Sequence, residues 1–154
     1  MASRIEKTET EKAYYAGYVD GEGCITLSKN KGSNKWHTTP IFYYLEVMVA
    51  NTHPETLFDL KRDFGGSIYG DRRRSPNKTV YRWRIICSKA LIFLETILPY
   101  LRQKRKQAEL MIEYQKKIGA KEFWKGQGIK LTIEESRRRE DLYKQMRELN
   151  RRGI

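Results

Sequence analysis

The alternation of hydrophobic and polar residues along the 154-residue chain predicts helices and strands in a regular order. Apolar residues three and four positions apart indicate helices, and strict alternation indicates half-buried strands. We expect helices at about residues 10–20, 54–64, 88–98, 100–118 and 132–150, and strands at about 24–29, 41–50, 67–70 and 79–87. The sequence therefore predicts an α+β fold with one antiparallel sheet and additional C-terminal helices.

Side-chain alternation also separates the two faces of the predicted sheet. Val47 alternates with Glu46 in the second strand, and Trp83 alternates with Arg82 and Arg84 in the last strand. We expect the apolar face to pack against helices and the polar face to be solvated. A solvated sheet face is either an ordinary wet surface or a recognition surface, and the alternation leaves both interpretations open.

The charge of the chain favours an acidic polymer as the partner. The chain has 31 Lys and Arg against 19 Asp and Glu, a net charge of +12. Residues 100–154 carry 16 of those basic residues and only 8 of the acidic ones. Such an imbalance indicates nucleic-acid binding without distinguishing DNA from RNA, so a basic RNA-binding structural protein explains the charge equally well.

Several other classes of protein do not fit the sequence. No segment approaches the run of about 18 apolar residues that a membrane-spanning helix needs, and the N-terminus lacks the apolar core of a signal peptide. We therefore expect a protein that is not secreted and has no membrane partner. The two Cys and two His residues lie far apart without metal-ligand spacing, which excludes an ordinary structural zinc site.

Residues 15–23, with the sequence YAGYVDGEG, break two local rules. Asp20 and Glu22 lie at the C-terminal end of the expected helix, where the helix dipole disfavours each carboxylate by about 0.3–1 kcal/mol. The same helix has one face of small side chains, formed by Ala13, Ala16 and Gly17. Small side chains bury little area unless another helix approaches closely. A close helix–helix contact together with a bound cation explains both features.

The same nine residues resemble the LAGLIDADG motif, with identical residues at Ala16, Gly17, Asp20 and Gly23. Residues 98–108 resemble the lysine-rich segment with a proline, an aromatic residue and a leucine that follows the second hairpin in single-motif members. This resemblance to the LAGLIDADG homing endonucleases implies an αββαββα core with an antiparallel DNA-binding sheet over residues 1–120. Residues 121–154 are then a basic C-terminal helical extension.

The resemblance implies a site-specific endonuclease, encoded by an intron or intein, that cleaves both strands of a long pseudo-palindromic DNA target. Because the chain has one motif and a double-strand cut needs two, it implies a homodimer. Hard oxygen ligands select Mg²⁺ as the cofactor, with Mn²⁺ as a substitute. Such proteins act in the cytoplasm of a bacterial or phage host or in an organelle. The alternative is a cleavage-inactive member of the family, either a maturase that binds intron RNA or a DNA-binding regulator.

The resemblance also assigns roles to individual residues. It implies that Glu22 is the metal-binding catalytic carboxylate and that the Gly21 carbonyl is a second metal ligand. Lys104 aligns with a basic residue near the cleavage centre, and Asn51 with a polar residue that positions water. The expected dimer interface contains Ala13, Ala16, Gly17 and Asp20.

DNA contacts are expected from the polar sheet face, the hairpin tip and the basic helix that follows. Outward parity on the strands selects most of these residues, because side chains two apart share a face. The expected DNA-binding residues are Ser28, Asn30, Tyr44, Glu46, Arg72, Arg82, Arg84 and Lys106.

Overall fold

The computed structural model describes residues 6–31, 41–71, 78–119 and 132–151. Its helices are α1 (Glu9–Glu22), α2 (Glu55–Phe64), α3 (Cys87–Ile97), the 3₁₀ helix η1 (Leu98–Tyr100), α4 (Arg105–Ile118) and α6 (Ile133–Leu149). Its strands are β1 (Gly23–Lys31), β2 (Ile41–Asn51), β3 (Ser67–Asp71) and β4 (Val80–Ile86). The predicted α+β class and the αββαββα order with an additional C-terminal helix are confirmed.

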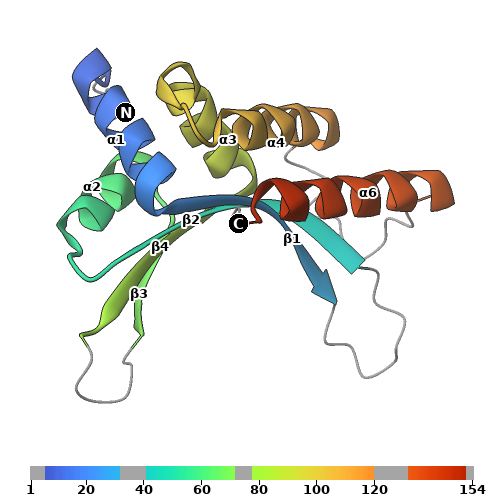
Figure 1. The fold of residues 1–154 in the computed structure, drawn as a ribbon, viewed down its shortest axis with the longest axis horizontal. Helices are drawn as coiled ribbons and strands as arrows, with labels where there is room; N and C mark the ends of the chain where they lie inside the picture. Colours follow the sequence, from blue (N-terminus) through green and yellow to red (C-terminus); the bar gives the residue numbers. More distant parts are fainter. Residues whose placement is uncertain (1–5, 32–40, 72–77, 120–131, 152–154) are drawn as a thin grey trace.

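The four strands form one antiparallel sheet in the order β1-β2-β4-β3. The sheet is curved, and the described helices lie on its convex side (Figure 1). Strand register aligns Cys24 with Met48, Met48 with Arg84, and Arg84 with Ser67. Residues that pair directly in an antiparallel sheet share a face, so the concave face carries rows of side chains that run across all four strands.

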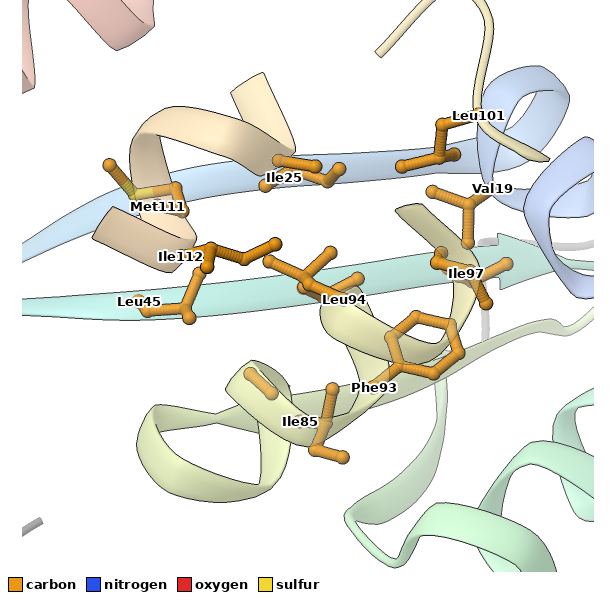
Figure 2. Packing of buried hydrophobic residues seen from close by; sticks show 14 of the residues in the cluster. Val19, Ile25, Leu45, Ile85, Phe93, Leu94, Ile97, Leu101, Met111 and Ile112 are labelled. Carbon is orange, nitrogen blue, oxygen red and sulfur yellow. The ribbon is translucent and has the colours of Figure 1, made fainter. Parts of the chain in front are cut away.

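The hydrophobic core fills the space between the convex side of the sheet and the helices (Figure 2). Trp83 and Val47 are fully buried, as the alternation predicted. Ile25 and Leu94 from β1 and α3 meet in the same cluster. Burying one large apolar side chain contributes about 1.5–3 kcal/mol, so this single layer of side chains fixes the helices on the sheet.

The helix α1 is longer than predicted and passes directly into β1. It ends at Glu22 rather than near residue 20, and Gly23 is both its C-cap and the first residue of β1. A Cβ at Gly23 would lie 2.9 Å from the carbonyl oxygen of Val19, so only glycine fits this close passage from helix to strand.

The helix expected over residues 100–118 begins only at Arg105, so the prediction is wrong for its first five residues. The carboxylate of Asp20 binds this segment instead. It accepts hydrogen bonds from the backbone N–H groups of Arg102, Gln103 and Lys104, at 2.8, 3.2 and 3.0 Å. Because these N–H groups bind the Asp20 side chain from α1, residues 102–104 form a non-helical turn that precedes α4.

The C-terminal helix α6 packs beside β1 on the convex side of the sheet (Figure 1). The Glu140 carboxylate accepts a hydrogen bond from the Tyr43 hydroxyl and forms an ion pair of 2.9 Å with Lys29. The Asn150 side-chain amide donates to the carbonyl of Ile25 at 2.8 Å. The expected boundary between core and extension, near residue 120, lies outside the described residues, and that division stays a prediction. No helix in the described ranges is both long and apolar enough to cross a membrane.

Replacing Asp20 with Asn should lower the free energy of unfolding by about 1.5–3 kcal/mol, because hydrogen bonds to a charged carboxylate would be lost. Glu22→Gln is the matched control. The Glu22 carboxylate is exposed, and such substitutions usually change stability by less than about 0.5 kcal/mol. Urea unfolding at one protein concentration measures both variants. Equal losses for the two would contradict the assignment of Asp20 as the residue that fixes this turn.

Cys87 should react slowly with alkylating reagents at neutral pH. Burial at the junction of β4 and α3 raises the pKa of its thiol to about 11. Since only the thiolate reacts, the rate should increase about tenfold for each pH unit between 7 and 10. Iodoacetamide labelling of a Cys24→Ser variant, followed by mass spectrometry, measures this rate. A rate that levels off near pH 9 would mean that the thiol titrates close to the ordinary value of about 8.5.

Candidate active site

The C-terminal end of α1 presents a carboxylate to solvent. Glu22 is the last residue of the helix, and its side chain is exposed. No hydrogen bond or ion pair holds this carboxylate within the described residues. The Gly21 carbonyl belongs to the last helical turn, whose carbonyl groups lack partners inside the helix. Each chain therefore offers one carboxylate and one carbonyl oxygen at this position, and both are donors that Mg²⁺ prefers.

The described residues of one chain contain no cluster of three or more His, Cys, Asp or Glu side chains that would hold a metal ion. Asp20, the other acidic residue of the motif, directs its carboxylate at the turn before α4. The Asp20 side chain is thus engaged by its own chain, and its expected place in a dimer interface stays a prediction. Glu22 is the motif carboxylate that faces outward.

Lys104 lies against the same end of α1. Its ammonium group donates a hydrogen bond of 2.5 Å to the carbonyl of Asp20, and Lys104 is also the N-cap residue of α4. The cation therefore neutralises part of the negative end of the helix dipole. The structure brings Lys104 close to the motif, as the sequence predicted, while its participation in cleavage stays a prediction.

Asn51 lies at the end of β2, and its side chain is engaged at both ends. Its amide nitrogen donates to the Tyr18 hydroxyl at 2.7 Å, and its amide oxygen accepts from the backbone N–H of His53 at 3.0 Å. Burial raises the pKa of the Tyr18 hydroxyl, so it remains protonated at neutral pH. No local sequence pattern signals this hydrogen bond between α1 and the end of β2. The expected role of Asn51 in positioning water stays a prediction.

The outer face of α1 is formed by small residues. Ala13, Gly17 and Gly21 are exposed and lie four residues apart. A Cβ added at Gly17 or at Gly21 would meet no described atom within 4 Å, so the packing of this chain does not require glycine there. Glycine inside a helix costs about 0.5–1 kcal/mol relative to alanine. Contacts within the described part of one chain do not explain why glycine, with this cost in helix stability, occupies these positions.

The expected position of Ala16 on this outer face is wrong. Ala16 is fully buried and packs in the core with Tyr15 and Val19. With about 3.6 residues per turn, positions 16 and 19 face the sheet when 13 and 17 face outward. The small residues of α1 therefore divide between two faces, and only one face is open to a partner.

The concave face of the sheet gathers most of the predicted DNA-binding residues, although they come from separate strands. The strand pairings place these residues on that face: Ser28, Asn30, Tyr44, Glu46, Arg82 and Arg84. Lys106 is exposed in the first turn of α4, away from the sheet, and Arg72 lies outside the described residues. The same pairings place Met48 and Tyr69 on this face, although neither is among the expected DNA-binding residues.

Three side chains form a cluster at the centre of the concave face. The Arg84 Nε donates to the Glu46 carboxylate, and its Nη2 donates to the Tyr44 hydroxyl at 3.0 Å. The Arg84 side chain is 34% exposed, and that of Glu46 is 12% exposed. The guanidinium therefore covers the carboxylate and is itself open to the concave side.

Comparison of the sequence with known proteins finds two endonucleases. The chain is 29% identical over 108 residues to the DNA endonuclease I-CvuI of Chlorella vulgaris, an alignment that covers 69% of this chain and 64% of the relative. It is 36% identical over 75 residues to the probable intron-encoded endonuclease Cox1-I1b of Schizosaccharomyces pombe, covering 46% of this chain and 18% of that protein. The chain thus spans less than two thirds of each curated relative. No protein-family model matches it.

Comparison of the fold finds homing endonucleases solved as complexes with DNA. The archaeal intron-encoded endonuclease I-Vdi141I superposes with a TM-score of 0.69 at 15% identity, over 96% of this chain and 89% of that one. I-CvuI, crystallised with a DNA target in the presence of magnesium, gives a TM-score of 0.59 at 22% identity over 90% and 95% of the chains. By its motif, its sequence relatives and its fold, the chain is similar to the LAGLIDADG homing endonucleases.

Proposed function

We propose that the chain is one subunit of a homodimeric, Mg²⁺-dependent endonuclease that cleaves both strands of a long, pseudo-palindromic DNA site. The observation that carries the proposal is the end of α1, where the exposed Glu22 carboxylate stands beside a helix face of small residues. A second copy packed on that face would place two such carboxylates together. The concave sheet supplies the surface for the DNA.

The concave sheet supports DNA as the substrate. It is free of described helices and carries Arg82, Arg84 and several uncharged polar side chains (Figure 1). A two-stranded ribbon fits the major groove, where each base pair presents its own pattern of donors and acceptors. The net charge of +12 supports contacts with the phosphates on either side of the groove. A sheet that reads base edges between flanking phosphate contacts suits a long target.

The donor set at the end of α1 suits a hard divalent cation, with Glu22 and the Gly21 carbonyl from each subunit as the residues that would hold it. When bound, such a cation activates water and stabilises negative charge on the phosphate. Two Glu22 carboxylates at close range would repel each other, and a bound cation would offset that repulsion. The remaining oxygen ligands would come from the DNA phosphates and from water. Mn²⁺ offers the same preference for oxygen ligands.

Lys104 is the residue proposed to act beside the metal ligands. Its ammonium group is held at the end of α1, two residues before Glu22, by the Asp20 carbonyl. A cation held there favours the negative charge that develops on the scissile phosphate. Asn51 is fixed by Tyr18 and His53 in the neighbouring part of the fold, and we propose that it orients water in the bound complex.

Replacing Glu22 with Gln should abolish cleavage and leave DNA binding intact, because the change keeps the shape of the side chain and removes its charge. Without metal, binding should tighten slightly, since two negative charges near the phosphates are lost. The probe is a duplex selected for binding from a random library. Gel shift without metal and strand cleavage with Mg²⁺ are measured separately.

The matched control for that experiment is Glu113→Gln, which removes an exposed carboxylate from α4. The control should cleave at the wild-type rate. Wild-type cleavage by Glu22→Gln, with the same metal requirement, would overturn the proposed mechanism.

Replacing Gly17 with Leu should convert the dimer to a monomer without unfolding the chain. The described atoms leave open space at Gly17, and leucine favours helix more than glycine does. A leucine side chain would hold two α1 helices apart. Sedimentation velocity measures the change, and Lys116→Leu on the exposed face of α4 is the control. Wild-type protein that sediments as a monomer while cutting both strands would contradict the homodimer.

A further inference from the structure

The guanidinium of Arg84 is held in one orientation from two directions. Its Nε donates to Glu46, and its Nη2 donates to the Tyr44 hydroxyl at 3.0 Å. The carbon at the centre of the guanidinium also lies 5.7 Å from the centre of the Tyr44 ring. Three contacts on an arginine that is one-third exposed restrict its rotamers before any ligand binds, so little entropy remains to be lost on binding.

The contacts of Arg84 leave the end of its guanidinium group, formed by Nη1 and Nη2, open. Arginine has five N–H donors in a rigid plane, and Glu46 and Tyr44 engage two of them, from Nε and Nη2. Nη1 has no recorded partner among the described residues, and Nη2 keeps a second N–H. The end of the fork, with one parallel donor from each terminal nitrogen, is therefore available on the open side of the sheet. This pair of donors matches the O6 and N7 acceptors of guanine in the major groove.

We propose that Arg84 determines sequence specificity by reading one guanine in each half of the target, with Glu46 and Tyr44 as its positioning residues. The proposal rests on the proposed function of the concave face. Arg84 lies on β4, between β2 and β3, at the middle of the sheet rather than at its rim. A side chain at the middle of a sheet in the major groove faces base edges, whereas phosphates flank the groove.

The register also places this guanine within the target. Arg84 pairs with Met48, and Met48 pairs with Cys24, which follows Glu22 by two residues. Adjacent strands lie about 4.8 Å apart, so two strand spacings separate Arg84 from the strand that carries the end of the motif. We place the guanine in the inner part of each half-site, near the cleavage centre.

Within the described residues, Arg82, the neighbouring arginine on this face, has no such pair of positioning contacts. Its ion pair there is long, 3.8 Å to Asp71, whose side chain is 54% exposed. An exposed partner at that distance holds an arginine weakly, so Arg82 is suited to an adaptable phosphate contact. The two arginines are therefore expected to respond differently to the same substitution.

The test selects bound duplexes from a random-sequence library with the wild-type protein and with single variants, and compares the resulting base preferences. Arg84→Lys keeps the charge and removes the fork, so preference for the guanine should fall roughly five- to 150-fold. Glu46→Gln should weaken the same preference while affinity for unselected DNA stays equal or rises. Arg82→Lys and Arg62→Lys, the latter on α2, should retain the guanine. Urea unfolding of each variant confirms that it is folded.

The outcomes separate this proposal from the proposed function. A wild-type consensus whose guanine persists in both Arg84→Lys and Glu46→Gln overturns the role of Arg84 and leaves the endonuclease assignment standing. Loss of the preference for the same guanine in Arg82→Lys would mean that Arg82 contacts this base, and that result would also overturn the proposal. Wild-type protein that selects no common sequence removes the site-specific function, and the role of Arg84 with it.

Discussion

The hydrogen bonds between Asp20 and the turn before α4 are the constraint on which the candidate site depends. Three backbone N–H groups bind the Asp20 carboxylate, and the Lys104 ammonium binds the Asp20 carbonyl. Asp20 therefore links the C-terminal end of α1 to the turn that precedes α4. Its side chain stabilises the fold, while Glu22, two residues later, is left open to solvent. Of the two carboxylates of the motif, one stabilises the fold and the other is open to solvent, where we propose that it binds the metal.

The fold places α1 between two different environments. One face, with Ala16 and Val19, is part of the core above the sheet, and the opposite face, with Gly17, has no described neighbour. Because Gly23 lets the helix pass directly into β1, the position of the catalytic candidate is tied to the strand register. A two-fold axis through the open face would join two curved sheets into one continuous DNA-binding surface. One chain contributes half of the proposed site.

The sequence predicted the strands and their faces, and it marked the end of α1 as a candidate site, because side-chain alternation and acidic residues at a helix C-terminus are local signals. It did not predict that α4 begins at Arg105, since Asp20, 82 residues from Arg102 in the chain, decides that boundary. It misplaced Ala16 because small residues on both sides of α1 hide which face is buried. The pairing of Arg84 with Glu46 depends on the register of β2 and β4, which no local pattern specifies.

The most direct measurement is chemical cross-linking between two α1 helices. In a Cys24→Ser background, an Ala13→Cys variant carries a thiol on the open face of α1, and Lys116→Cys carries one on the exposed face of α4. The half-buried thiol of Cys87 should react slowly at pH 7, because partial burial raises its pKa. A short bis-maleimide should join Ala13→Cys chains into covalent dimers and leave Lys116→Cys chains as monomers. Equal yields from the two variants, or no dimer from either, would contradict the packing of two copies through α1.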